Sequence, residues 1–290
     1  TATFTGAGGN FTGTKDVTFK VVAAGDVRDA INLADVDVTL VPQTGAFTGK
    51  AHTPSVSLSI DGDPVGLVEG TDFKATFSDN VNAGKASLTL TNLSDKCIGT
   101  KTFADVYTIT PVALSASMID ALADVAYDGA DHKPQLNLRH GAYSLIEGTD
   151  YTVTMTDARG TQRTQAVDAG TYTLTIDAAG SNFTGRTTAT FTVNSVDMSA
   201  ASVTAANQSY DGTAKTPEPQ VVLNGKVLVN NTDYHVGYTA NTAVGTATVT
   251  ATGTGNYTGT ATGHFTISGR ELSGDAGAVG TFAQVTMADA

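Results

Sequence analysis

Residues 210–268 read YDGTAKTPEPQVVLNGKVLVNNTDYHVGYTANTAVGTATVTATGTGNYTGTATGHFTIS. Within this stretch, small and apolar residues alternate with threonine, as in Ala247, Val249 and Ala251. A period of two places the apolar side chains on one face of a strand and the threonines on the other. Threonine and valine favour strands, whereas glycine and asparagine favour tight turns. The stretch therefore predicts short, half-buried strands joined by turns.

Three landmarks of this stretch recur along the chain in the same order. The first is an aromatic residue, any residue and glycine, at 47–49, 127–129 and 210–212. The second is a Thr-Asp-aromatic turn that ends at Phe73, Tyr151 and Tyr234. The third is an Asn-aromatic-Thr-Gly turn at 182–185 and 256–259, with a degenerate KCIG at 96–99. Ordered landmarks at near-constant spacing indicate a tandem repeat of about 80 residues.

A period of about 80 residues is too long for a solenoid and fits one small sandwich per copy. We therefore predict an all-β chain of tandem, small Ig-like β-sandwich repeats, with β-grasp-like modules as the alternative topology. The expected segments are the C-terminal part of a preceding repeat (1–23), repeat 1 (24–111), repeat 2 (112–194), repeat 3 (195–268) and the start of a following module (269–290).

The recurring residues have conformational roles that need no ligand. Gly49, Gly129 and Gly212 supply backbone positions where a positive φ costs little, and we expect the aromatic residue two positions earlier to fold inward. Asp150 and Asp233 can accept hydrogen bonds from backbone amides of their own turns. We therefore expect these landmarks to serve folding.

Composition excludes several classes of partner and site. The formal net charge of −12 opposes binding to nucleic acid, and no apolar run is long enough for direct membrane insertion. The single cysteine, Cys97, excludes a disulfide within the chain and is expected to be a small buried hydrophobe. No lysine recurs at a fixed place in all three repeats, which disfavours Lys-Asn isopeptide crosslinks.

No catalytic or cofactor motif is found, and the five histidines lie in separate modules without ligand spacing. We therefore predict that the chain is not an enzyme and carries no cofactor or metal. Acidic pairs such as Asp35 with Asp37 and Asp61 with Asp63 have the oxygen ligands that calcium prefers. Ordinary turn chemistry explains them better, because no loop has the ligand density of a dedicated site.

Two loops of repeat 2 depart from the other copies and are the candidate ligand contacts. An insertion of about eight residues around DARGTQRTQ carries Arg159 and Arg163. The turn LRHGAYS carries Arg139, His140 and Tyr143. A host glycan or protein is the partner that these loops would contact. The alternative is a tolerated surface insertion without a ligand.

The strings YDGTAKTPEPQV, VLVNNTDYHVGY and VGTATVTATGTGNYTGTATGHFTI of repeat 3 closely resemble the YDG or MBG type of bacterial Ig-like repeat. The resemblance covers nearly the whole chain and weakens in repeat 1. It implies a stalk or spacer segment of a cell-surface, adhesin-like protein, wall-attached or secreted, whose partners are the neighbouring modules. It supplies no catalytic residues.

Residues 1–22 match only the last part of a repeat, as in residues 246–268. An incomplete sheet leaves an open edge, which predicts strand pairing with another chain.

Overall fold

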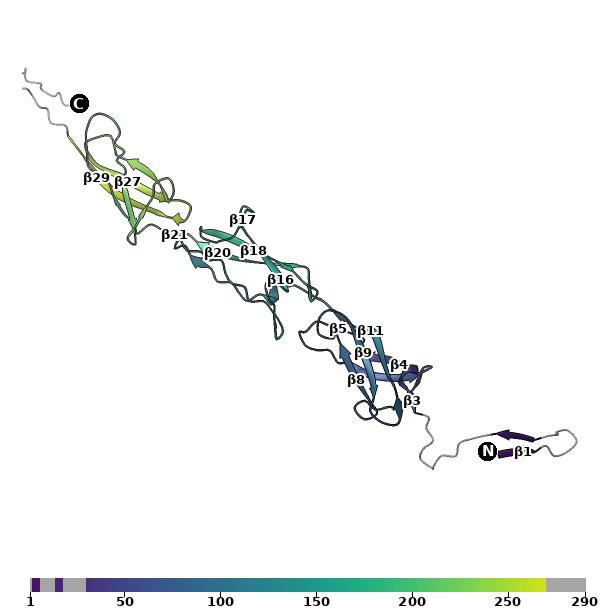
Figure 1. The fold of residues 1–290 in the computed structure, drawn as a ribbon. Helices are drawn as coiled ribbons and strands as arrows, with labels where there is room; N and C mark the ends of the chain where they lie inside the picture. Colours follow the sequence, from purple (N-terminus) through teal and green to yellow (C-terminus); the bar gives the residue numbers. More distant parts are fainter. Residues whose placement is uncertain (1, 6–13, 18–29, 270–290) are drawn as a thin grey trace, which may run out of the picture. The chain divides into compact units, whose positions relative to one another are not determined.

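The computed structural model describes residues 2–5, 14–17 and 30–269. Within these residues the chain is all β, and its helices are two single 3₁₀ turns, η1 (Leu33–Asp35) and η2 (Ala116–Met118). None of the described helices has the length and apolar character needed to cross a membrane. The prediction of an all-β fold is therefore confirmed. Figure 1 shows the arrangement of the strands and labels many of them.

The strands of the first part of the chain are β1 (Ala2–Thr5), β2 (Thr14–Val17), β3 (Ile31–Asn32), β4 (Asp37–Val41), β5 (Thr44–Ala46), β6 (Ser55–Ile60), β7 (Asp63–Pro64), β8 (Phe73–Ser78), β9 (Gly84–Asn92), β10 (Cys97–Ile98), β11 (Thr100–Thr110) and β12 (Val112–Ala113). Those of the middle part are β13 (Val125–Ala126), β14 (Arg139–His140), β15 (Tyr143–Ser144), β16 (Tyr151–Asp157), β17 (Gln162–Arg163), β18 (Gly170–Ala178), β19 (Phe183–Thr184) and β20 (Arg186–Asn194). The remainder are β21 (Val196–Asp197), β22 (Ser202–Thr204), β23 (Gln208–Ser209), β24 (Gln220–Leu223), β25 (Lys226–Leu228), β26 (Tyr234–Thr239), β27 (Gly245–Gly253), β28 (Tyr257–Thr258) and β29 (Thr260–Ser268).

The described chain forms two compact units, and the division between them crosses repeat 2. Unit 1 comprises Thr1–Asp120, Asn137–Val153 and Ile176–Thr187, and unit 2 comprises Ala121–Leu136, Thr154–Thr175 and Thr188–Ala290. Strands β16, β18 and β20 of repeat 2 each cross this division. They belong to one five-stranded sheet of order β13-β20-β18-β16-β17.

Unit 1 contains a four-stranded sheet of order β5-β11-β9-β8 and a three-stranded sheet of order β4-β6-β7. Strands β8, β9 and β11 pair antiparallel, whereas β5 pairs parallel with the end of β11. Both sheets contribute buried side chains, including Leu40 and Leu58 from the smaller one and Leu88 and Leu90 from the larger one. Cys97 is fully buried, as predicted for a small hydrophobe.

Unit 2 shows how the sandwich closes around its core. One sheet has the order β22-β24-β25 and the other has the order β23-β29-β27-β26. Val203, Val221 and Leu223 of the first sheet pack with Val249 and Ala251 of the second in one hydrophobic cluster. The core therefore lies between the two sheets, as the alternation of residues 246–251 predicts.

Every repeat opens with a short strand that pairs parallel with the strand of its third landmark. The pairs are β3 with β10, β12 with β19 and β21 with β28. This pairing brings the start of each repeat to the Asn-aromatic-Thr-Gly turn or its KCIG equivalent. That turn is consequently placed at the end of the repeat that faces the preceding linker.

The predicted positive φ is confirmed at the first landmark, and the second landmark also contains left-handed residues. Gly49, Gly129 and Gly212 have φ of 74°, 86° and 84°. In the Thr-Asp-aromatic turn, Gly148 and Asn231 adopt φ of 82° and 62°. Residues 6–13, 18–29 and 270–290 lie outside the described residues. The predicted pairing edge in 1–22 and the following module in 269–290 therefore fall outside them too, apart from β1, β2 and Gly269.

Candidate functional site: the joints between repeats

The hairpin that carries the first group of candidate residues is formed by β14 and β15. Arg139 pairs with Ser144 and His140 with Tyr143 across it. Arg139 is exposed, whereas Tyr143 is half-buried and donates its hydroxyl hydrogen to Asp150 Oδ2 at 3.0 Å. Burial, reinforced by the Asp150 carboxylate, raises the pKa of Tyr143. Tyr143 is thus held in place by its own repeat.

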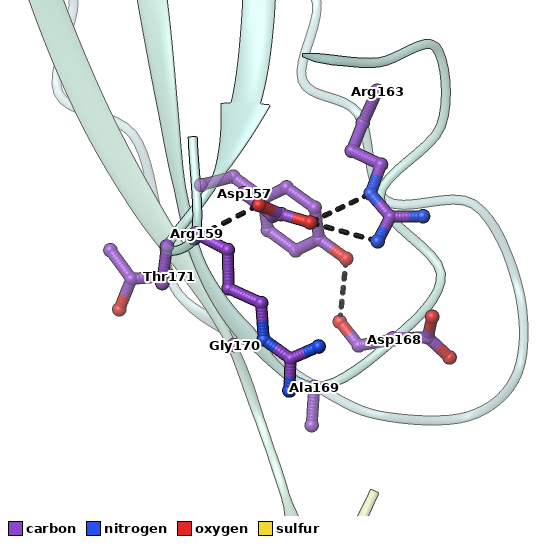
Figure 2. Close-up of a pocket in the computed structure, with 9 residues that line it drawn as sticks. Asp157, Arg159, Arg163, Asp168, Ala169, Gly170 and Thr171 are labelled. Atoms are coloured by element: carbon purple, nitrogen blue, oxygen red, sulfur yellow. Dashed lines mark hydrogen bonds and ion pairs between the residues drawn. The ribbon is translucent and has the colours of Figure 1, made fainter. Parts of the chain in front are cut away.

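The second group of candidate residues lies beside a shallow hollow of about 220 Å³ (Figure 2). Arg163 donates from Nε to Asp157 Oδ2 at 2.8 Å, and the same carboxylate accepts the backbone N–H groups of Arg159 and Thr161. The hydrogen bond from the Arg163 side chain is the main reason that the pKa of Asp157 is lowered. These hydrogen bonds all lie within the inserted hairpin, so Arg163 stabilises the conformation of that loop.

Arg159 also lines this hollow, and its side chain is exposed to solvent. Within the described part of the chain its guanidinium forms no ion pair. Figure 2 shows it extending away from the Asp157–Arg163 pair. The two groups of candidate residues belong to different compact units, since Tyr143 lies in unit 1 and Arg159 in unit 2. The structure does not bring them together in one described site.

A cluster of aromatic rings within unit 1 joins repeat 1 to repeat 2. Phe47 of repeat 1 meets Tyr143 edge-on at a centroid distance of 5.0 Å and Phe183 at 5.4 Å. Phe47 is 1% exposed and Phe183 2% exposed, so both rings are removed from water. Edge-to-face pairs of this kind contribute about 0.5–1.5 kcal/mol each beyond the burial of their area. We call this cluster, with the contacts of Asn182 described next, the first joint.

Asn182 supplies the polar half of the first joint. Its side-chain oxygen accepts the backbone N–H of Ala83 at 2.8 Å, and its Nδ2 donates to Asn82 Oδ1 at 3.2 Å. Asn82 and Ala83 precede Gly84, the first residue of β9. The asparagine of the third landmark of repeat 2 therefore bonds a loop of repeat 1.

The second joint lies within unit 2 and repeats this arrangement between repeats 2 and 3. Tyr127 meets Tyr257 edge-on at 5.7 Å and packs against the core of repeat 3. Asn256 accepts the backbone N–H of Ala169 at 2.6 Å and donates to Asp168 Oδ1 at 3.3 Å. The same two positions of the Asn-aromatic-Thr-Gly turn thus form both joints.

Tyr143 has a counterpart in the second joint that is chemically different. Counted back from the aromatic residue of the Thr-Asp-aromatic turn, Tyr143 and Lys226 both stand eight positions before it. Lys226 Nζ lies 5.3 Å from the ring centroid of Tyr127 and 5.5 Å from that of Tyr257. A hydrogen bond with the Tyr257 side chain raises the pKa of Lys226. The ammonium is attracted to the faces of the two rings. The same position of the repeat therefore contacts the aromatic rings of each joint. It does so with the ring of Tyr143 in the first joint and with the ammonium of Lys226 in the second.

The expectation that the aromatic residue of the first landmark folds inward needs correction. Phe47 and Tyr127 are covered by residues of the following repeat, and Tyr210 remains 40% exposed. The reason is their place on the backbone. The N–H groups of Phe47, Tyr127 and Tyr210 each bond the last residue of the closing strand, at Thr110, Asn194 and Ser268. These rings consequently stand at the end of a repeat, where the next one begins.

Among the described residues, no group of three or more histidine, cysteine or acidic side chains could hold a metal ion. No family model matches the chain, and no curated protein matches it. Among solved structures, a titin segment of three immunoglobulin domains, an E-to-A mutated variant, has a TM-score of 0.30 at 10% identity and covers 81% of this chain and 99% of its own. A TM-score of 0.30 is too low to support an inference about function.

Proposed function

We propose that this chain is a non-catalytic structural segment whose modules are held end to end by these joints. In this proposal it is a stalk or spacer of a bacterial cell-surface, adhesin-like protein, wall-attached or secreted. The observation that carries the proposal is that the same positions form both joints, with asparagine on a backbone amide and an aromatic ring on an aromatic ring. The resemblance to YDG or MBG repeats supports the cell-surface location.

The physical argument concerns bending at each joint. A buried aromatic pair resists separation of two modules, because opening it returns apolar area to water. The asparagine bonds are directional, so they also resist rotation of one module about the other. A chain joined in this way at each step holds what it carries at a set distance from its anchor. That property is what a spacer requires, and it needs no reactive side chain.

The joints predict a measurable effect of removing either asparagine. In Asn182→Ala we expect hydrogen exchange of residues 79–85 to become about tenfold faster, since the Ala83 amide loses its acceptor. In Asn256→Ala the same change is expected for residues 165–171, through the Ala169 amide. Each variant should affect its own joint only. Hydrogen exchange with mass spectrometry reports both loops in one experiment.

Asn137→Ala is the matched control, because Asn137 is exposed and its side chain forms no hydrogen bond among the described residues. It should leave exchange in both loops unchanged. Small-angle scattering of the unmodified chain should give an elongated monomer, and the double variant Asn182→Ala/Asn256→Ala should broaden its distance distribution. Unchanged exchange in both loops, or a compact globule in scattering, would argue against the proposal.

A second candidate function is binding of a host glycan at the hollow of repeat 2. It is favoured by the exposed guanidinium of Arg159, which forms no ion pair within residues 2–5, 14–17 and 30–269. Guanidinium groups donate up to five hydrogen bonds and suit acidic sugars. On a glycan array we expect binding that is lost in Arg159→Ala and kept in Arg139→Ala, an exposed arginine of the other compact unit. Silence of the unmodified chain across the array would remove this candidate.

A further inference from the structure

Repeat 3 carries two of the features that repeats 1 and 2 contribute to the joints, the aromatic residue of the first landmark and the residue before the glycine, and here both are exposed. Tyr210 is 40% exposed and Val244 is 57% exposed. Tyr210 occupies the position of Phe47 and Tyr127, with its N–H bonded to Ser268 at 2.9 Å. Val244 precedes Gly245, the first residue of β27, as Ala83 precedes Gly84 and Ala169 precedes Gly170.

The loop that contains Val244 has the same backbone arrangement as the two loops already engaged. In each loop, the backbone carbonyl four positions before the glycine accepts a backbone hydrogen bond. Asn80, Ala166 and Asn241 accept the N–H groups of His52, His132 and Lys215 in this way. In repeats 1 and 2, the amide before the glycine donates to an asparagine of the next repeat. The N–H of Val244 has no hydrogen-bond partner among the described residues. The donor is therefore in place and unused.

We propose that the surface formed by Tyr210, Ala243 and Val244 is a docking site for the Asn-aromatic-Thr-Gly turn of another module of this repeat type. The proposal rests on the proposed function, since it takes the two joints as the pattern. The asparagine of the incoming turn accepts the N–H of Val244, and its aromatic residue packs edge-on against Tyr210. A residue at the position of Tyr143 or Lys226 covers the two rings.

The two engaged joints define what the docking site selects. An incoming turn of the KCIG type, as in repeat 1, does not fit, because Lys96 has no side-chain acceptor for the Val244 amide and Cys97 has no ring for Tyr210. Lys96 is instead paired with the buried carboxylate of Asp72 at 3.2 Å. One contact of the engaged joints is lost at this site. Ala243 stands where Asn82 and Asp168 accept the asparagine Nδ2, so we expect docking here to be weaker than at either joint.

The test duplicates residues 195–268 in tandem within the full chain, so that the added copy follows Ser268 of the first. Hydrogen exchange of residues 240–246 in the first copy is expected to become about tenfold slower than in the unmodified chain, the protection of one hydrogen bond of ordinary net strength. The same loop of the added copy should keep the unmodified rate. Asn256→Ala in the added copy alone should abolish the protection, and Tyr210→Ala in the first copy should reduce it.

Three outcomes overturn the docking site. They are unchanged exchange of residues 240–246 in the duplicated chain, protection that persists after Asn256→Ala in the added copy, and protection in the unmodified chain that rises with protein concentration. The last would mean that a second molecule occupies the surface. Asn182→Ala and Asn256→Ala in the unmodified chain keep the two proposals apart. Suppose that these two variants accelerate exchange at residues 79–85 and 165–171 while the duplication leaves residues 240–246 unprotected. That result would contradict the docking site and support the two joints.

Discussion

Phe183→Ala is expected to destabilise repeat 2 by about 3–5 kcal/mol, the usual cost of removing a buried phenylalanine ring. Phe183 is 2% exposed, and its ring meets both Phe47 and Tyr143. The variant removes the shared partner of both rings, so the first joint should open as well. Chemical denaturation measures the loss of stability. Hydrogen exchange of residues 79–85 measures the opening of the joint.

Phe191→Ala separates these two effects. Phe191 is also 2% exposed, but it stacks on Tyr172 at 5.4 Å within repeat 2 and touches no ring of repeat 1 among the described residues. We expect a similar loss of stability with little change in exchange at residues 79–85 under native conditions. If both variants accelerate that exchange equally, the ring of Phe183 has no separate role at the joint.

Much of the fold can be predicted from the sequence, because its signals are local. The alternating threonines in residues 246–251 predict a strand with one solvent-exposed face and one buried face. Ala247, Val249 and Ala251 are indeed all fully buried. The glycines of the first landmark require a positive φ, and they adopt it. These features depend on neighbours within a few positions. They can therefore be predicted without knowing how distant segments of the chain pack.

The joints cannot be read from the sequence in the same way. In a tandem repeat each landmark recurs in every copy, so a contact within one copy and a contact with the next copy leave the same pattern. For that reason the sequence predicts that the ring of Phe47 folds inward, whereas the ring contacts Tyr143 and Phe183 of the following repeat. The residue that covers the aromatic pair at each joint is also hard to recognise in the sequence, because its side chain differs between the two joints. Tyr143 and Lys226 share no property except their place, eight residues before the turn.

The candidate ligand loops show a related limit. Departure of one copy from the others is a local signal, and it singles out Tyr143 as a candidate ligand contact. The signal does not state what the residue contacts. Tyr143 faces the first joint, where its hydroxyl is bonded to Asp150 and its ring to Phe47. Arg159, by contrast, is exposed, and its guanidinium forms no ion pair in the part of the chain that the structure describes.

Gly49→Ala is expected to destabilise the chain by about 2–5 kcal/mol through two separable effects. Gly49 has a φ of 74°, a conformation that costs an L-residue about 1–2 kcal/mol. A Cβ at this position would also clash with Tyr143 Cδ2. Displacing that ring adds about 1–3 kcal/mol, as overpacking usually does. The second effect acts on the joint, so exchange at residues 79–85 should also accelerate.

The chain carries two matched controls for this substitution. Gly129 and Gly212 have φ of 86° and 84°, and the nearest atom to a Cβ at Gly129 is 3.9 Å away, with none within 4 Å at Gly212. Gly129→Ala and Gly212→Ala therefore incur the backbone cost alone, and the excess loss in Gly49→Ala measures the clash with Tyr143. Because the clash needs the ring, Tyr143→Ala should cancel most of that excess in the double variant. Equal losses in all three single variants, measured by urea denaturation, would mean that the ring of Tyr143 yields without cost and does not hold the joint.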